Sequence, residues 1–203
     1  HISFGTVNDT DGNPFKTRDG GTKKLTDLYD ETYQYIKAIN IELDEISLGL
    51  LSNTVLTYSD LITNRNTDYK FDLEKFTNVN GKTGVYIQYA NVRAQKLIND
   101  SSLEVSDFSI LSKELDNNDK SLLRSLIKFE FYFEQTIKNN EPHHLADYLY
   151  EISQKFNGMY QGINILENEN AVLKENKLKI TDLFLQYSNL LMECLGILPV
   201  KKM

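Results

Sequence analysis

A short stretch near the start of the chain carries two cations and a hydroxyl, Lys16, Thr17 and Arg18, with Gly20 and Gly21 shortly after them. Positive side chains and free backbone N–H groups stabilise phosphate charge, so this composition suits an anionic ligand. The Gly-x-x-x-x-Gly-Lys-Ser/Thr arrangement of a P-loop is absent. These residues alone leave two interpretations open, a phosphate-binding loop and a polar surface turn.

Two tyrosines, Tyr86 and Tyr89, share one face of a helix expected over residues 84–99. Rings spaced in this way can stack on unpaired bases or pack in a core. The spacing favours the core for Tyr89 and does not decide for Tyr86. Arg93 lies on the same face and is able to meet a phosphate, although such a charge usually belongs to a solvated face. The same two interpretations apply to Lys96, Lys120, Arg124 and Lys128.

A metal site is not expected from the sequence. The three histidines are His1, His143 and His144. The adjacent pair should point in divergent directions from a helix, which leaves no recognisable ligand set. The single cysteine, Cys194, lies in an apolar run and is expected to behave as a small core hydrophobe.

Composition excludes several classes of protein. The chain has 203 residues, of which 40% are hydrophobic and 25% charged, as in soluble globular proteins. No apolar run approaches the roughly 20 residues of a membrane span, and no secretory signal opens the chain. The net charge of −7 argues against a general nucleic-acid coating protein but permits local RNA contacts. The first residue is His1 rather than Met, which suggests a fragment.

The elements that must position these residues are mostly helical. Glycines and a proline make residues 1–21 strand or loop. Residues 64–84 are rich in Asn, Asp, Thr and Gly and predict an extended connection. Apolar spacing predicts helices near residues 24–38, 46–63, 84–99, 120–138, 142–160 and 174–195, with the helix at 120–138 central and the last one ended by Gly196 and Pro199.

Several longer strings resemble arginyl-tRNA synthetases, which are class I aminoacyl-tRNA synthetases. They are His1-Ile2-Ser3-Phe4-Gly5-Thr6-Val7, Phe15-Lys16-Thr17-Arg18, Tyr86-Ile87-Gln88-Tyr89, His143-His144-Leu145-Ala146-Asp147-Tyr148-Leu149-Tyr150, Phe156-Asn157 and Leu195-Gly196-Ile197-Leu198-Pro199 with the terminal Met203. The resemblance covers nearly the whole chain. Departures from the family pattern occur at Asn80, Val85 and Asn91.

This resemblance implies that Phe15-Lys16-Thr17-Arg18 is the family's version of the Lys-Met-Ser-Lys-Ser loop, which closes on ATP with its Mg²⁺. Phe15, Lys16 and Arg18 would bind ATP. Lys16, Thr17 and Arg18 would act in catalysis, with the two charges stabilising phosphate and Thr17 supplying a hydroxyl hydrogen bond.

The resemblance also implies a helical C-terminal domain that binds the tRNA anticodon. It assigns tRNA contacts to Tyr86, Gln88, Tyr89 and Arg93, and to a second aromatic pair, Phe156 and Tyr160. Met203 would lie against the anticodon loop, although a frayed tail is an equal alternative.

The sequence therefore predicts a mainly α fold in three parts. Residues 1–63 are a remnant of the catalytic domain with linking helices, residues 64–79 are a connection, and residues 80–203 form a helical anticodon-binding domain. The expected partners are arginine tRNA and, in the full enzyme, arginine and ATP, in the cytoplasm and without membrane or DNA. The chain alone is predicted to be inactive, because most of the nucleotide-binding fold has no counterpart in it. The alternative is a non-catalytic helical module that binds a protein partner.

Overall fold

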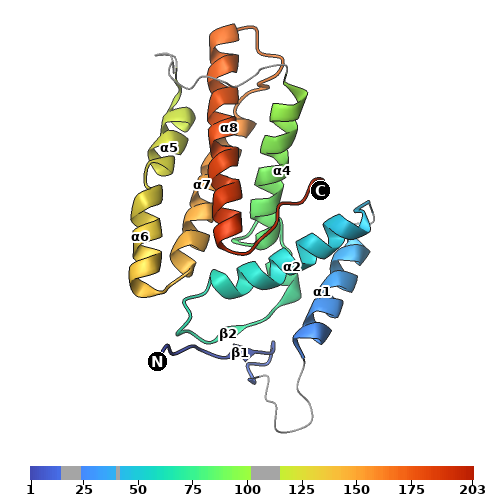
Figure 1. Ribbon diagram of the computed structural model, residues 1–203. Helices are drawn as coiled ribbons and strands as arrows, with labels where there is room; N and C mark the ends of the chain where they lie inside the picture. Colours follow the sequence, from blue (N-terminus) through green and yellow to red (C-terminus); the bar gives the residue numbers. More distant parts are fainter. Residues whose placement is uncertain (15–23, 40–41, 102–114) are drawn as a thin grey trace.

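A bundle of helices stands on a smaller layer of helices and short strands (Figure 1). This computed structural model describes residues 1–14, 24–39, 42–101 and 115–203. The bundle consists of α4 (Gly84–Asp100), α5 (Asn117–Leu126), α6 (Phe129–Asn139), α7 (His143–Gln161) and α8 (Ala171–Cys194). The prediction of a mainly α fold is confirmed. Among the described helices, none is both long enough and apolar enough to span a bilayer.

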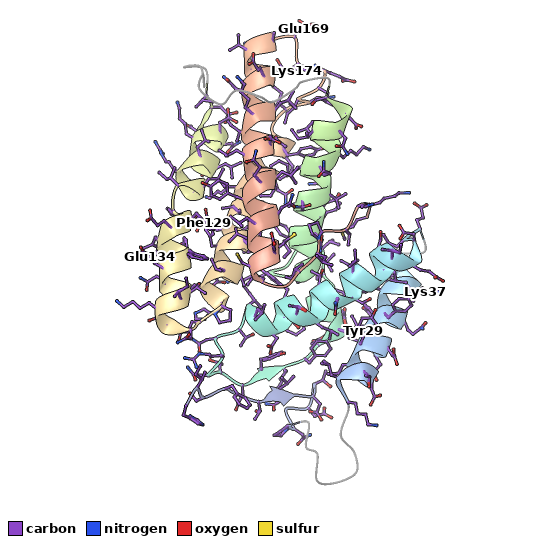
Figure 2. The ribbon with its side chains drawn as sticks, in the orientation of Figure 1. Tyr29, Lys37, Phe129, Glu134, Glu169 and Lys174 are labelled. Carbon is purple, nitrogen blue, oxygen red and sulfur yellow. The ribbon has the colours of Figure 1, made fainter. Side chains whose placement is uncertain are left out.

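Helix α7 is the centre of the bundle, because it contacts α4, α5, α6 and α8. Its side chains Tyr148, Ile152 and Phe156 are fully buried. Phe129, at the start of α6, points toward the bundle interior (Figure 2) and meets the rings of Tyr148 and Tyr187 at centroid distances of 6.5 Å and 5.6 Å. Aromatic packing of this kind supplies much of the apolar surface that the bundle buries.

The lower layer contains α1 (Leu25–Ile39) and α2 (Glu45–Leu61). Strand β1 (Val7–Asn8) pairs in parallel with β2 (Tyr69–Lys70), so the first residues of the chain join the segment that precedes the bundle. The one-turn helix α3 (Leu73–Phe76) follows β2. The connection predicted at residues 64–84 is therefore extended only in part.

Helices α2 and α4 approach each other closely at Gly84. A Cβ atom at this position would lie 2.8 Å from the backbone oxygen of Thr54, so only glycine fits without a shift. The preceding residue, Thr83, caps α4 by accepting a hydrogen bond from the Tyr86 N–H at 3.2 Å. The small residue and the cap together fix where α4 starts, and hence the direction of every side chain along it.

The single helix predicted at residues 120–138 is wrong, because the chain breaks between α5 and α6. The hydroxyl of Tyr148 donates to the carbonyl oxygens of Ser125 and Leu126, at 3.1 Å and 3.0 Å. These carbonyls thereby gain a partner on α7, which stabilises a break in the helical ladder. Helix α6 has no buried residue, so the central position belongs to α7 instead.

The prediction for Cys194 is also wrong. Its side chain is exposed at the end of α8. The neighbouring Leu191, Met192 and Leu195 face the core instead. The apolar run at residues 190–195 does not by itself indicate which side chain the helix exposes to solvent.

Candidate functional site

Helices α4 and α7 run in the same direction and place matching polar and aromatic side chains opposite each other. Lys82, just before α4, forms an ion pair with Asp147. Further along, Tyr86 meets Tyr150, and Arg93 meets Asn157. We call this row the α4–α7 seam and define it as Lys82, Tyr86, Tyr89, Arg93, Asp147, Tyr150, Asn157 and Tyr160.

Arg93 is the best-organised charge of the seam. Its guanidinium carbon lies 4.0 Å from the ring centroid of Tyr89 and 5.2 Å from that of Tyr160. It also donates to the Tyr89 hydroxyl at 2.7 Å and to Asn157 Oδ1 at 3.2 Å. Cation–π contacts and hydrogen bonds thus hold a planar cation between two rings. Because Tyr89 is 36% exposed, a charge and an aromatic surface reach solvent side by side.

The first part of the seam pairs the rings of Tyr86 and Tyr150 next to the ion pair of Lys82 with Asp147. The rings of Tyr86 and Tyr150 lie 5.2 Å apart with an interplanar angle of 56°. Burial, and to a smaller degree the neighbouring Tyr86, raises the pKa of the Tyr150 phenol, which therefore stays neutral at physiological pH. Tyr86 is half-buried, and the cation of Lys82 is 5.9 Å from the Tyr150 ring centroid.

Two residues predicted to contact tRNA are buried, and these predictions are corrected. The Gln88 side chain is fully buried and donates to Thr54 Oγ1 and to the Leu198 carbonyl, both at 2.8 Å. Phe156 is also fully buried, with its ring stacked on Phe184 at 4.3 Å. Both residues join parts of the fold and offer no surface to a ligand.

The remaining predicted residues are divided between the seam and other places. Tyr89, Arg93 and Tyr160 come together, as described above. Met203 is half-buried and packs against the apolar cluster that contains Ile36 and Leu51. Lys201 and Lys202 are exposed. The residues predicted to bind ATP or to act in catalysis, Phe15, Lys16, Thr17 and Arg18, lie outside the described residues.

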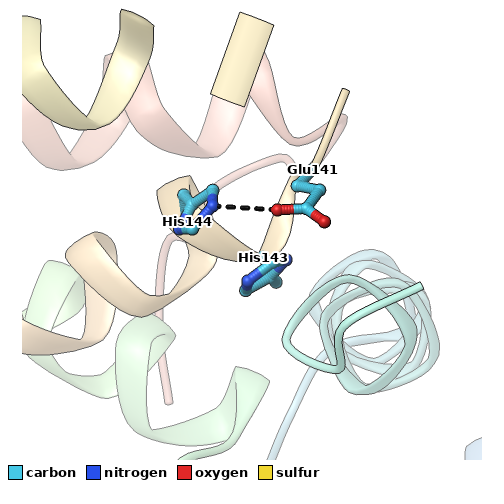
Figure 3. A group of neighbouring side chains, drawn as sticks. All are labelled: Glu141, His143 and His144. Carbon is cyan, nitrogen blue, oxygen red and sulfur yellow. Dashed lines mark hydrogen bonds and ion pairs between the residues drawn. The ribbon is translucent and has the colours of Figure 1, made fainter. Parts of the chain in front are cut away.

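The histidine pair differs from its prediction. The rings of His143 and His144 do not diverge, since their centroids are 4.1 Å apart. His144 Nε2 lies 3.1 Å from Glu141 Oε2 (Figure 3). Both histidines lie in the first turn of α7, where rotation about the side-chain bonds brings the rings to one side. Burial, with a smaller contribution from His144, lowers the pKa of His143 below its ordinary value.

The sequence interpretation missed Asn157 and Tyr150 as members of the seam. Both lie inside motifs that had been noticed, Phe156-Asn157 and Tyr148-Leu149-Tyr150. The spacing along α7 placed them near candidate residues, but only the packing of α4 against α7 shows which face they share with Arg93.

Family models match both parts of the chain. The DALR anticodon binding domain matches residues 87–203, which is more than half of the chain. The catalytic domain of class I tRNA synthetases (R) matches residues 1–73.

Curated relatives and solved structures agree with these matches. The arginine–tRNA ligase of Alcanivorax borkumensis is 33% identical over all of this chain, which covers 36% of that protein. The arginyl-tRNA synthetase structure of Plasmodium falciparum is 26% identical with a TM-score of 0.81, over all of this chain and 35% of that one. The arginyl-tRNA synthetase structure of Thermus thermophilus shares the fold, with 19% identity and a TM-score of 0.84. The match covers all of this chain and 35% of that one.

The chain thus spans about a third of the length of the relatives that it matches and joins the end of a class I catalytic domain to an anticodon-binding domain. It belongs to the arginyl-tRNA synthetase family.

Proposed function

We propose that this chain recognises the anticodon stem-loop of an arginine tRNA through the Arg93 end of the α4–α7 seam. The single observation that carries the proposal is the guanidinium of Arg93 held between Tyr89 and Tyr160, within the part of the chain that matches an anticodon-binding domain. The relatives and family models give no support to the alternative of a protein-binding module.

The chemistry of this group suits a single-stranded loop. An unpaired base can stack on the exposed surface of Tyr89, and the adjacent cation can meet a phosphate. Because the net charge is −7, the global field repels RNA and the attraction must be local. Recognition would therefore depend on a few preorganised groups, with Arg93 the foremost.

The test is binding of a labelled anticodon stem-loop of arginine tRNA at low salt, measured by fluorescence anisotropy. Arg93→Ala should weaken binding by roughly 5- to 150-fold, which corresponds to the ~1–3 kcal/mol of a stacking contact. Arg93→Lys keeps the charge but loses the planar group, and should fall between Arg93→Ala and the unchanged protein.

Lys96→Ala is the matched control, because Lys96 is an exposed cation on the same helix outside the seam. It should change the affinity by less than about threefold, as expected for one solvated charge. Equal losses from Arg93→Ala and Lys96→Ala, or equal affinity for an unrelated stem-loop, would refute recognition by this group. Circular dichroism confirms that each variant is folded.

In the complete protein the proposed activity is the charging of arginine tRNA with arginine in the cytoplasm. Phe15, Lys16 and Arg18 are proposed to bind ATP with Mg²⁺, and Lys16, Thr17 and Arg18 to act in catalysis. The division of the chain into residues 1–63, 64–79 and 80–203 is likewise a proposal. Support comes from the class I catalytic match over residues 1–73. Lys16→Ala in a protein with the whole catalytic domain should abolish most ATP–pyrophosphate exchange. The present chain alone should show none above background, with arginine and tRNA supplied.

A further inference from the structure

Three potential metal ligands lie together at the turn between α6 and α7. Glu141, His143 and His144 each offer one ligand atom, and these atoms all lie within 4.8 Å of one another. Figure 3 shows the three side chains gathered at the start of α7, with the Glu141 carboxylate directed at His144. This group is separate from the Arg93 end of the seam, where the proposed function is located.

The backbone that carries the group is held firmly. Asn140 adopts the left-handed conformation with φ of 55° and ends α6. The next residue, Glu141, donates its N–H to the Thr136 carbonyl at 3.1 Å, which ties it to the last turn of α6. Pro142 is the N-cap residue of α7, and its ring fixes the backbone between the carboxylate and the two imidazoles. The three donors are therefore presented by a short, rigid segment.

The spacing fits a small divalent ion. Zn²⁺ binds imidazole nitrogen and carboxylate oxygen at about 2.0–2.2 Å, which puts the ligand atoms of a tetrahedral site roughly 3.3 Å apart. The existing distance between Glu141 Oε2 and His144 Nε2 is 3.1 Å, close to that value. The ligand atom of His143 lies within 4.8 Å of each of the other two. Two imidazoles with one carboxylate are also a donor set that zinc accepts, with the fourth position left to water.

His143 adds a second observation. Its Nδ1 atom is buried and has no hydrogen-bond partner among the described residues. A buried polar atom without a partner costs roughly 1–3 kcal/mol, so such atoms call for an explanation. A metal ion bound at Nδ1 would supply the partner that this atom lacks.

The surrounding charges do not prevent cation binding. Lys82 acts on His143 electrostatically, but it is already paired with Asp147. The positive end of the α7 dipole also opposes a cation, by about 0.3–1 kcal/mol at an exposed helix end. The carboxylate of Glu141 lies at this same end and offsets that repulsion.

We propose that Glu141, His143 and His144 form a binding site for a divalent zinc-like metal ion that ties the α6–α7 turn to the first turn of α7. The site is not required for the proposed RNA contact. Its effect is local stabilisation, because an ion that binds only the folded state raises the free energy of unfolding.

The test is titration of the EDTA-treated chain with ZnCl₂ against a chromophoric chelator, together with Co²⁺ absorption spectroscopy. All proteins carry Cys194→Ser and His1→Ala, because the exposed thiol and the first histidine can themselves bind metal. We expect one Zn²⁺ per chain and a visible Co²⁺ band of four-coordinate type. We also expect a higher unfolding temperature with Zn²⁺ than with EDTA.

His144→Ala and Glu141→Gln should each weaken Zn²⁺ binding by about tenfold or more and remove the Co²⁺ band. Two variants are used so that a folding defect in one leaves the other informative, and Gln154→Ala, an exposed change elsewhere on α7, is the matched control. Absence of stoichiometric binding in the background protein, or unchanged binding in both ligand variants, overturns the proposal. A loss of stem-loop binding by Arg93→Ala with intact Zn²⁺ binding would show that the two proposals stand separately.

Discussion

Replacing Gln88 with leucine removes the polar side chain that joins α4 to α2 and to the C-terminal segment. Gln88 is fully buried and donates at 2.8 Å both to Thr54 Oγ1 and to the Leu198 carbonyl. The side-chain oxygen of Gln88, Oε1, accepts a hydrogen bond from the Val200 N–H at 3.0 Å. The side-chain amide of Gln88 on α4 therefore joins this helix to α2 and to the C-terminal segment.

The cost of the substitution follows from these partners. The Val200 N–H is left buried without an acceptor, at about 1–3 kcal/mol, and the two lost donor bonds cost ~0.5–1.5 kcal/mol each. Leucine returns roughly 1 kcal/mol through apolar burial. The free energy of unfolding should consequently fall by about 1–5 kcal/mol.

Urea unfolding followed by circular dichroism measures this loss, with Gln95→Leu as the control on the same helix. Gln95 donates to the exposed Asn99 at 3.0 Å, and its replacement should change stability by less than about 0.5 kcal/mol. A loss under ~1 kcal/mol for Gln88→Leu would refute the structural role. If the folded variant instead kept its stability and lost stem-loop binding, Gln88 would be a direct RNA contact after all.

Substitutions at Gly84 and Lys177 should also lower the free energy of unfolding. Gly84→Ala should lower the unfolding free energy by about 1–3 kcal/mol, because its Cβ would meet the Thr54 backbone oxygen at 2.8 Å; thermal unfolding without such a loss would mean that α2 and α4 separate easily. Lys177→Met should cost about 3–5 kcal/mol, since it leaves the fully buried Asp119 without its 2.7 Å partner. Burial lowers the pKa of Lys177, but hydrogen bonds from its ammonium to Asp119 and Asp116 outweigh this and raise it overall. The stabilisation by this cation should therefore persist below pH ~10.5 and disappear as the pH rises through the raised pKa. A urea midpoint equally alkali-sensitive in Lys177→Met would contradict that assignment.

Helix positions were predictable from the sequence because apolar spacing reports which side of a helix meets a core. The break between α5 and α6 was not, since the Tyr148 hydroxyl that stabilises it approaches the Ser125 and Leu126 carbonyls from another helix. No local pattern contains that contact.

The site residues show the same limit. Tyr89 and Arg93 are four residues apart, so their contact could be anticipated from helical spacing, whereas Tyr160 reaches Arg93 only through the packing of α4 on α7. Gln88 was proposed as a tRNA contact on its place in a motif, and nothing in that motif indicates burial. Motif membership locates a functional segment, while the direction of each side chain depends on the tertiary structure.

The burial of Val200 has a consequence for the order in which the protein can fold during synthesis. This residue is 4% exposed and belongs to the same apolar cluster as Ile36, Leu51 and Val55, which precede it by about 150 residues. Closing so long a loop is slow compared with local helix formation. On the ribosome, α1 and α2 must therefore wait with an incomplete apolar surface until the Val200 region has emerged from the exit tunnel. Premature termination shortly before this region would leave nearly all helices synthesised and the lower layer unfinished.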